Sequence, residues 1–341
     1  MEEEEEEEWI IPGLTNDVAA LILSRFPRSH IRVLSQVCRR WKKFLRSEDC
    51  NDVRKLTGTM EEFMCVLMED KPGTDVYWEV FDSSGNKLGR IPNVPNPGPR
   101  KWGYGVTVLN EKILFIGGFM GGIACPIASA DVYEFSPATN SWRKLADMNT
   151  PRYNFSLAEV DGLLYVFRGC TKYGYPLSSY EVYNPETNQW TLEDSPNTHV
   201  DIGFAFSSTS KIYVFDNGTP IIDIYDTKAN TWAKLRSDEI MGVYSYTVLR
   251  NKVYFLDSEL SGCLGLLDPE TDTWFSVNVP TEPGGSQSKL GRWNDKVLLF
   301  LQNPVGKTKM NGFTKEEGYR WRDCDQIKLS GYHLFNVLIK F

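Results

Sequence analysis

The sequence predicts a mainly β protein that begins with a small α-helical module. Residues 9–50 carry apolar side chains at helical spacing. From about residue 60, short apolar runs alternate with turn residues, which is the pattern of β-strands. A phrase that ends in tryptophan recurs every 42 to 48 residues. At 341 residues, the chain is long enough for two domains or for one repeat array.

Composition and charge favour a folded protein with a charged N-terminal tail. Hydrophobic residues make up 41% of the chain and aromatic residues 13%, which is ample for a buried core. The formal net charge is -8, and the run Glu2 to Glu8 supplies seven of those charges, so the remainder is close to neutral. A block of like charges repels itself and stays solvated. We therefore expect residues 1–8 to form a disordered acidic tail.

The compartment can be inferred from the N-terminus and the cysteines. The acidic start disfavours a secretory signal or a mitochondrial presequence, and no stretch of 18 apolar residues occurs, so we expect no membrane association. The seven cysteines are scattered and include no CxxC pair. This usage indicates reduced thiols in a cytoplasmic or nuclear protein and argues against a disulfide framework or a zinc site.

Residues 9–50 predict short helices. Residues 15–17 are helix-starting types, and Pro27 ends the first helix because its ring cannot continue the hydrogen-bond ladder. A second apolar stripe follows at spacings of three and four residues, and Ser35 is a candidate break within it. This stripe consists of Ile31, Leu34, Cys38, Trp41 and Leu45.

The helical module is too small to bury all its apolar side chains. Val33, Val37 and Phe44 lie off the main stripe, and no acidic residue interrupts positions 18–47. An exposed apolar patch rimmed by charge marks a partner site. The alternative is a helical cap on the downstream domain. Nucleic-acid binding is disfavoured because the rest of the chain lacks basic clusters.

The remainder of the chain is repetitive. In each phrase an aromatic or apolar residue stands seven positions before the tryptophan, and an Asx residue stands two before it, where a tight turn favours left-handed backbone. A strand–turn–strand segment precedes most of the phrases. The Asx residues are Asn140, Asn188, Asn230 and Asp272, and the tryptophans are Trp142, Trp190, Trp232 and Trp274.

The repeats predict a β-propeller over residues 60–341. Five repeats run from about 103 to 328, and strands near residues 62–92 and 332–341 remain at the two ends. Pairing of these terminal strands would close a sixth blade and remove exposed sheet edges. We therefore expect six blades.

The first fifty residues resemble an F-box, and the repeats resemble the kelch propeller, in the combination found in plant F-box/kelch proteins. Thr15 departs from the proline that is usual in this family, and the double glycine of kelch repeats survives only as Gly117-Gly118. The resemblance implies that the helical module docks a Skp-type adaptor of a cullin–RING ligase. The residues implied in adaptor binding are Pro12, Leu14, Val18, Ile22, Leu23, Phe26, Pro27, Leu34, Val37, Cys38 and Trp41.

We expect a target protein to bind to loops at one face of the propeller, because loops of variable length are tolerated there. Arginine and large aromatic side chains dominate interface hot spots. The alternative for Arg100 and Arg152 is an internal hydrogen-bonding role in the channel. The candidate target-binding residues are Arg100, Trp102, Arg152, Tyr153, Tyr173 and Tyr175.

The sequence argues against catalysis. It holds three histidines, His30, His199 and His333, too few for the copper set of propeller oxidases, and no nucleophile or nucleotide motif follows a suitable strand. We expect no metal or cofactor. The favoured interpretation is the substrate-recognition subunit of an SCF-type E3 ubiquitin ligase, with residues 9–50 as the F-box and residues 60–341 holding a target protein. The alternatives are a kelch scaffold outside any ligase and, less favoured, a propeller enzyme.

Overall fold

The computed structural model describes most of the chain. The predicted acidic tail, Arg100 and Asp272 lie outside the described residues. The described ranges are 9–71, 75–95, 101–122, 125–195, 203–236, 242–257, 263–271, 273–279, 287–302, 308–314, 320–323, 327–329 and 331–340.

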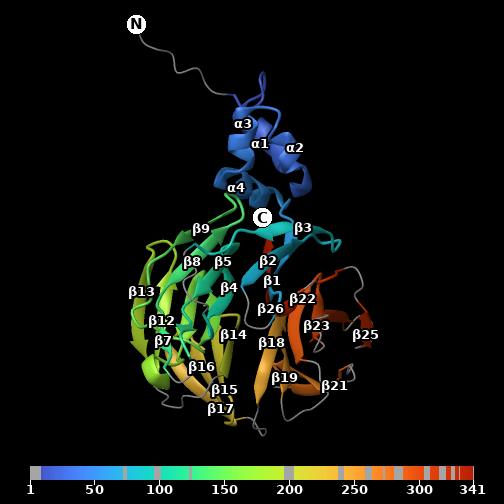
Figure 1. Ribbon diagram of the computed structural model, residues 1–341. Helices are drawn as coiled ribbons and strands as arrows, with labels where there is room; N and C mark the ends of the chain where they lie inside the picture. The colour runs from blue at the N-terminus through green and yellow to red at the C-terminus, as the bar shows by residue number, and fades with distance from the viewer. Residues whose placement is uncertain are drawn as a thin grey trace.

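Four short α-helices form the N-terminal module (Figure 1). The first helix begins after Thr15, in extended backbone, and the chain leaves helical geometry before Pro27. The predicted break at Ser35 separates the second helix from the third. The sequence did not predict the fourth, which Ser47 caps and Gly58 ends with a positive φ of 67°. The helices are α1 (Asn16–Ser24), η1 (Arg28–His30), α2 (Ile31–Leu34), α3 (Arg39–Leu45) and α4 (Glu48–Thr57).

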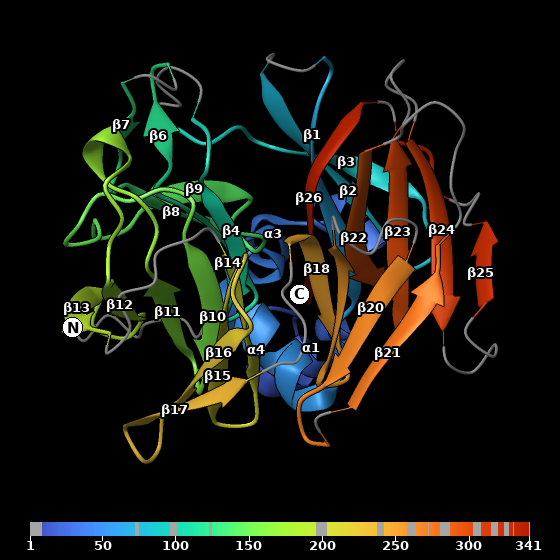
Figure 2. The ribbon, with the colours of Figure 1, turned by 90° about the horizontal axis from the view of Figure 1, so that it is seen from below.

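Six four-stranded antiparallel sheets, counted over the described residues, surround a common axis (Figures 1 and 2). This arrangement confirms the predicted mainly β propeller. Five sheets follow the order of the chain. They are β4 (Gly105–Leu109), β5 (Lys112–Ile116), β8 (Val132–Ser136) and β9 (Ser141–Lys144); β10 (Ser156–Val160), β11 (Leu163–Phe167), β12 (Ser179–Asn184) and β13 (Gln189–Asp194); β14 (Gly203–Ser208), β15 (Lys211–Asp216), β16 (Ile221–Asp226) and β17 (Thr231–Arg236); β18 (Val243–Leu249), β19 (Lys252–Asp257), β20 (Cys263–Asp268) and β21 (Thr273–Asn278); and β22 (Gln287–Trp293), β23 (Lys296–Gln302), β24 (Thr308–Thr314) and β25 (Arg320–Asp323).

The remaining four-stranded sheet joins the two ends of the propeller. Its innermost strand, β26 (Tyr332–Lys340), pairs antiparallel with β1 (Glu62–Glu69), which is followed by β2 (Val76–Phe81) and β3 (Lys87–Ile91). The pairing of β26 with β1 gives both strands partners, so neither presents an open edge there. A two-stranded hairpin, β6 (Phe119–Met120) with β7 (Ile127–Ala128), lies outside the six sheets.

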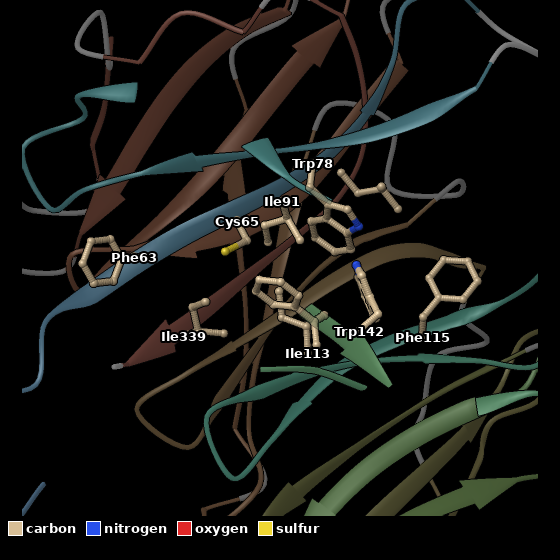
Figure 3. Close-up of a cluster of buried hydrophobic side chains, with 10 residues drawn as sticks. Phe63, Cys65, Trp78, Ile91, Ile113, Phe115, Trp142 and Ile339 are labelled. Atoms are coloured by element: carbon tan, nitrogen blue, oxygen red, sulfur yellow. The ribbon is translucent and has the colours of Figure 1, made fainter. Parts of the chain in front are cut away.

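The tryptophan phrases connect neighbouring blades. Asn140, Asn188 and Asn230 have φ values of 51°, 52° and 52°, which confirms the left-handed turn predicted there. Trp142 then crosses to the closing sheet, where its indole Nε1 donates to the carbonyl of Pro92 at 2.6 Å. Figure 3 shows Trp142 among the side chains of the closing sheet and of β5, including Trp78 and Ile113.

The propeller has two distinct faces. The innermost strands β4, β10, β14, β18 and β22 each end in a tight turn that leads into the second strand of the blade. The β4–β5 turn lies near the helical module, because its Glu111 pairs with Lys55 of α4. The innermost strands therefore begin at the opposite face, which Figure 2 views directly. No helix in the described part of the chain is long and apolar enough to span a membrane.

Candidate functional site

The core of the helical module is small and apolar. Ala20 and Leu23 of α1 pack against Phe44 and Leu45 of α3 and against Cys50 of α4. Leu23 is 0% exposed, so the prediction that it contacts the adaptor is wrong. In a helix, positions 22 and 23 point about 100° apart, so α1 can bury Leu23 in the core while Ile22 remains exposed.

Other apolar side chains of the module are exposed. Val33 and Val37 are 64% and 61% exposed. Four helices of this length cannot bury apolar side chains on every side, so a continuous binding surface remains available. The exposed members predicted from the sequence are Pro12, Val18, Ile22, Phe26, Pro27, Val37 and Cys38.

Two further exposed residues, Leu21 and Val33, extend this surface beyond the predicted set. Their signal was present in the sequence, because Val33 lies off the apolar stripe and Leu21 precedes Ile22 on α1. We call the exposed apolar side chains the adaptor face. It consists of Pro12, Val18, Leu21, Ile22, Phe26, Pro27, Val33, Val37 and Cys38.

The three remaining predicted residues, Leu14, Leu34 and Trp41, are half-buried. Trp41 acts as an internal brace, since its indole Nε1 donates to the carbonyl of Ile10 at 3.0 Å. Its backbone N–H also donates to Cys38 Sγ at 3.4 Å, which caps the start of α3. Trp41 therefore holds the N-terminal segment against α3 in addition to any contact with a partner.

The helical module also carries exposed basic side chains. None of them forms an ion pair within the part of the chain that the structure describes. Unpaired exposed cations attract a negatively charged partner and speed its association. These exposed cations are Arg25, Arg32, Arg39, Arg40, Lys42, Lys43 and Arg46.

Helix α4 links the module to the propeller. Glu48 accepts a hydrogen bond from Ser136 Oγ at 3.1 Å and lies 3.6 Å from Lys112 Nζ. Buried Arg54 donates to the carbonyls of Thr59 and Phe26 and lies 3.7 Å from Glu61. These contacts tie the helices to the first blades and to the chain that enters β1.

Arg152 lies in the interior of the propeller, so the prediction that it contacts a target is wrong. Its side chain is 0% exposed, and Nη2 pairs with Glu181 Oε1 at 2.6 Å. Nη1 donates to the carbonyl of Arg168 at 3.0 Å. Burial lowers the pKa of Arg152, although Glu181 opposes this effect. The Pro-Arg step after the phrase that ends in Trp142 is therefore a structural element, in line with the alternative of an internal hydrogen-bonding role.

Tyr153 is also structural. It is buried, and its ring lies 4.6 Å from that of Phe119 on the β6–β7 hairpin. Its backbone forms an isolated bridge with Cys170 of the second blade. Because its ring contacts Phe119 beside the first blade, Tyr153 joins the two blades. Trp102 bridges to the same Phe119, which brings the two predicted aromatics together at the face opposite the helices.

Three predicted target residues remain accessible. Trp102, Tyr173 and Tyr175 are 45%, 57% and 66% exposed. Tyr173 belongs to a short 3-10 turn, η2 (Lys172–Gly174), in which its own φ is 62°, and Lys172 Nζ lies 4.8 Å from its ring centroid. We call these three residues the aromatic edge.

The sequence did not predict a second cluster of buried charged residues in the propeller. Arg168 pairs with Asp216 and with Asp223, and all three side chains are buried between the second and third blades. A sequence signal existed, because an acidic residue stands third in the third strand of three successive repeats, as Glu134, Glu181 and Asp223. Across the described residues, no group of three or more His, Cys, Asp or Glu side chains is arranged to hold a metal ion.

Comparison with known proteins agrees with this architecture. Residues 11–52 match the F-box domain, and residues 103–149 and 151–197 match the Kelch motif. The chain is 58% identical over 339 residues to the F-box/kelch-repeat protein At1g27420 of Arabidopsis thaliana, with 97% of each chain covered. It is 34% identical over 341 residues to the F-box/kelch-repeat protein At1g67480 of the same plant, covering 97% of this chain and 89% of the relative.

A solved structure shares the propeller fold. The structure of YjhT superimposes with a TM-score of 0.56 at 14% identity, covering 72% of this chain and 91% of the other. At that identity the likeness concerns the fold alone. The F-box domain implies binding to a Skp-type adaptor, and F-box/kelch proteins are generally non-catalytic adaptors. This chain belongs to the F-box/kelch-repeat protein family.

Proposed function

We propose that this chain is a substrate receptor of an SCF-type cullin–RING ubiquitin ligase. Residues 9–50 dock the Skp-type adaptor, and residues 60–341 hold a protein that is to be ubiquitinated. The chain itself is non-catalytic. It acts by proximity, because a captured target then lies near the charged ubiquitin-conjugating enzyme on the ligase scaffold.

The observation that carries this proposal is the adaptor face. A folded module that leaves Val33 and Val37 more than half exposed has apolar surface that a partner can cover. The unpaired cations of the module suit an acidic partner. The residues of this surface all lie within residues 11–52, which match the F-box domain.

The position of the two faces fits a receptor. The adaptor face lies on the helices beyond the propeller, while the aromatic edge lies on the opposite face of the propeller. Contacts of Glu48 and Lys55 in α4 with the first blade keep the two in a fixed relation. A target held at the aromatic edge is therefore presented in a reproducible orientation.

Co-expression with a Skp-type adaptor tests the proposal. Size-exclusion chromatography should yield a one-to-one complex, and titration calorimetry should give its Kd. The variant Val33→Glu places a charge on the adaptor face and should weaken binding about 100-fold, since an unpaired charge in an apolar interface costs about 2–3 kcal/mol.

Leu192→Glu is the matched control, because Leu192 is 48% exposed on β13 of the propeller. This variant should bind the adaptor like the unchanged protein. Equal loss in both variants would assign the effect to misfolding. A folded protein that binds no Skp-type adaptor would contradict the ligase proposal. The alternative of a kelch scaffold that acts outside a ligase would then be favoured.

A further inference from the structure

The axis of the propeller contains a cavity of about 610 Å³. Residues from all six innermost strands, β4, β10, β14, β18, β22 and β26, line it. This volume is typical of pockets that hold a small organic ligand. Tyr244, Tyr246 and Phe335 give part of its wall an aromatic character.

One cation that lines this cavity, Lys289 of β22, has no counterion among the described residues. Its Nζ donates to the backbone carbonyl of Leu334 at 3.1 Å and lies 5.8 Å from the ring centroid of Phe335. It forms no ion pair within the described ranges. Burial lowers its pKa, and the more distant charge of Glu69 only opposes that effect.

The buried arginines of the same molecule differ from Lys289 in this respect. Arg54, Arg152 and Arg168 each have a carboxylate partner. A desolvated charge without a counterion destabilises a fold, so a cation left in that state is a candidate for pairing with an external anion. Lys289 is the third residue of β22, so it lies in the first half of this strand.

His333 of β26 also belongs to the lining of this cavity, but its ring is enclosed. It is 3% exposed and stacks on Phe300 with ring centroids 3.8 Å apart. Both ring nitrogens are buried, so a ligand in the cavity does not reach them. Burial, and then the positive charge of Lys289, lower the pKa of His333, although a hydrogen bond with Asn336 opposes this effect.

We propose that the cavity binds a carboxylate that pairs with Lys289. Arg250 and Arg292 also line the cavity, but Arg250 pairs with Asp295 and Arg292 donates to the carbonyl of Val248. A monoanion therefore suits Lys289 better than a phosphate dianion, which favours several cations. The aromatic wall of Tyr244, Tyr246 and Phe335 accommodates the apolar part of the same ligand. The carboxylate belongs either to a small organic acid or to an acidic side chain of a captured target, and only the second source rests on the function proposed above.

Thermal unfolding of the full chain with defined probes tests this site. Benzoate represents the small acid, with neutral benzamide as its control. A capped pentapeptide with one glutamate among glycines represents the target side chain, with the glutamine peptide as its control. We expect at least one carboxylate probe to raise the Tm in a saturable way and the neutral controls to leave it unchanged.

Two lysine variants assign the effect to the cavity. Lys289→Gln should weaken probe binding at least about tenfold, because the charge-assisted contact is lost. Lys211→Gln removes the same charge from an exposed position on β15 and should bind like the unchanged protein. Circular dichroism checks that both variants fold.

Each outcome decides the proposal. A benzoate response that disappears in Lys289→Gln supports a small-acid site, and a peptide response supports a target side chain. A Tm that neither carboxylate probe moves, or moves equally in Lys289→Gln, overturns it. The assay contains no adaptor, so its failure leaves the ligase proposal untouched.

Discussion

In the helical module, Val18, Ile22 and Val33 lie exposed, whereas in the propeller the charged residues Arg152 and Glu181 lie fully buried. The module is too thin to bury both sides of its helices, so side chains that look like core residues become a binding surface. The propeller packs blade against blade, so arginines that look like binding residues become internal braces. An apolar residue can therefore belong to a binding surface in the module, and a charged residue can belong to the interior in the propeller.

The largest expected effect concerns the buried pair. Arg152→Met leaves Glu181 buried without its cation and should lower the free energy of unfolding by about 3–5 kcal/mol. Arg143→Met is the control, because Arg143 is 65% exposed beside Glu134 and its loss should cost at most about 1 kcal/mol. Urea denaturation measures both. An unchanged free energy of unfolding in Arg152→Met would contradict a structural role of the buried Arg152–Glu181 pair.

The second prediction contrasts neighbours on α1. Leu23→Ala should destabilise the protein by about 2–5 kcal/mol, since it opens a cavity in the module core. Ile22→Ala should leave stability nearly unchanged, because Ile22 is 41% exposed, and should instead weaken adaptor binding. Unfolding curves and calorimetric titration with a Skp-type adaptor separate the two effects. The reverse pattern would show that α1 buries its other face.

A smaller effect is expected for the contacts between blades. The Trp190 indole donates to the carbonyl of Ala146 at 3.0 Å, and its ring lies 5.0 Å from that of Tyr183. Trp190→Phe keeps an aromatic ring but removes the donor, which should cost about 1 kcal/mol. Chemical denaturation provides the value. No measurable loss would mean that the tryptophan phrase stabilises the propeller by packing alone.

The smallest effect depends on pH. Burial alone would raise the pKa of Asp131, but hydrogen bonds from Lys101, Ser129 and Lys144 outweigh it and lower the pKa from 3.8 to about 2. A carboxylate with a lowered pKa stabilises the fold above its usual pKa, and that contribution is lost as the pH falls towards 2.

Comparison with Asp131→Asn measures this contribution. The stability difference between the two proteins should be constant above about pH 5 and should narrow between about pH 4 and pH 2. Urea denaturation at several pH values in this range gives the difference. A difference that does not change with pH would contradict the lowered pKa of Asp131.

Much of this protein could be inferred from local sequence patterns. The spacing of Trp142, Trp190 and Trp232 and the asparagines two positions before them identified the repeated turn, because turn geometry depends on a few adjacent residues. The period of those phrases identified the propeller. The helical stripe and the breaks at Pro27 and Ser35 identified the module, because helix formation is also local.

Only the tertiary structure decided which of these side chains can meet a partner. Leu23 and Ile22 are adjacent apolar residues, and packing against α3 and α4 buries one of them. Arg152 pairs with Glu181, whereas Lys289 has no carboxylate partner among the described residues, because the neighbours of both side chains come from other strands. Burial and charge pairing arise from residues distant in the chain, so the sequence determined the blades and helices while the assembled fold determined which residues remain free to bind.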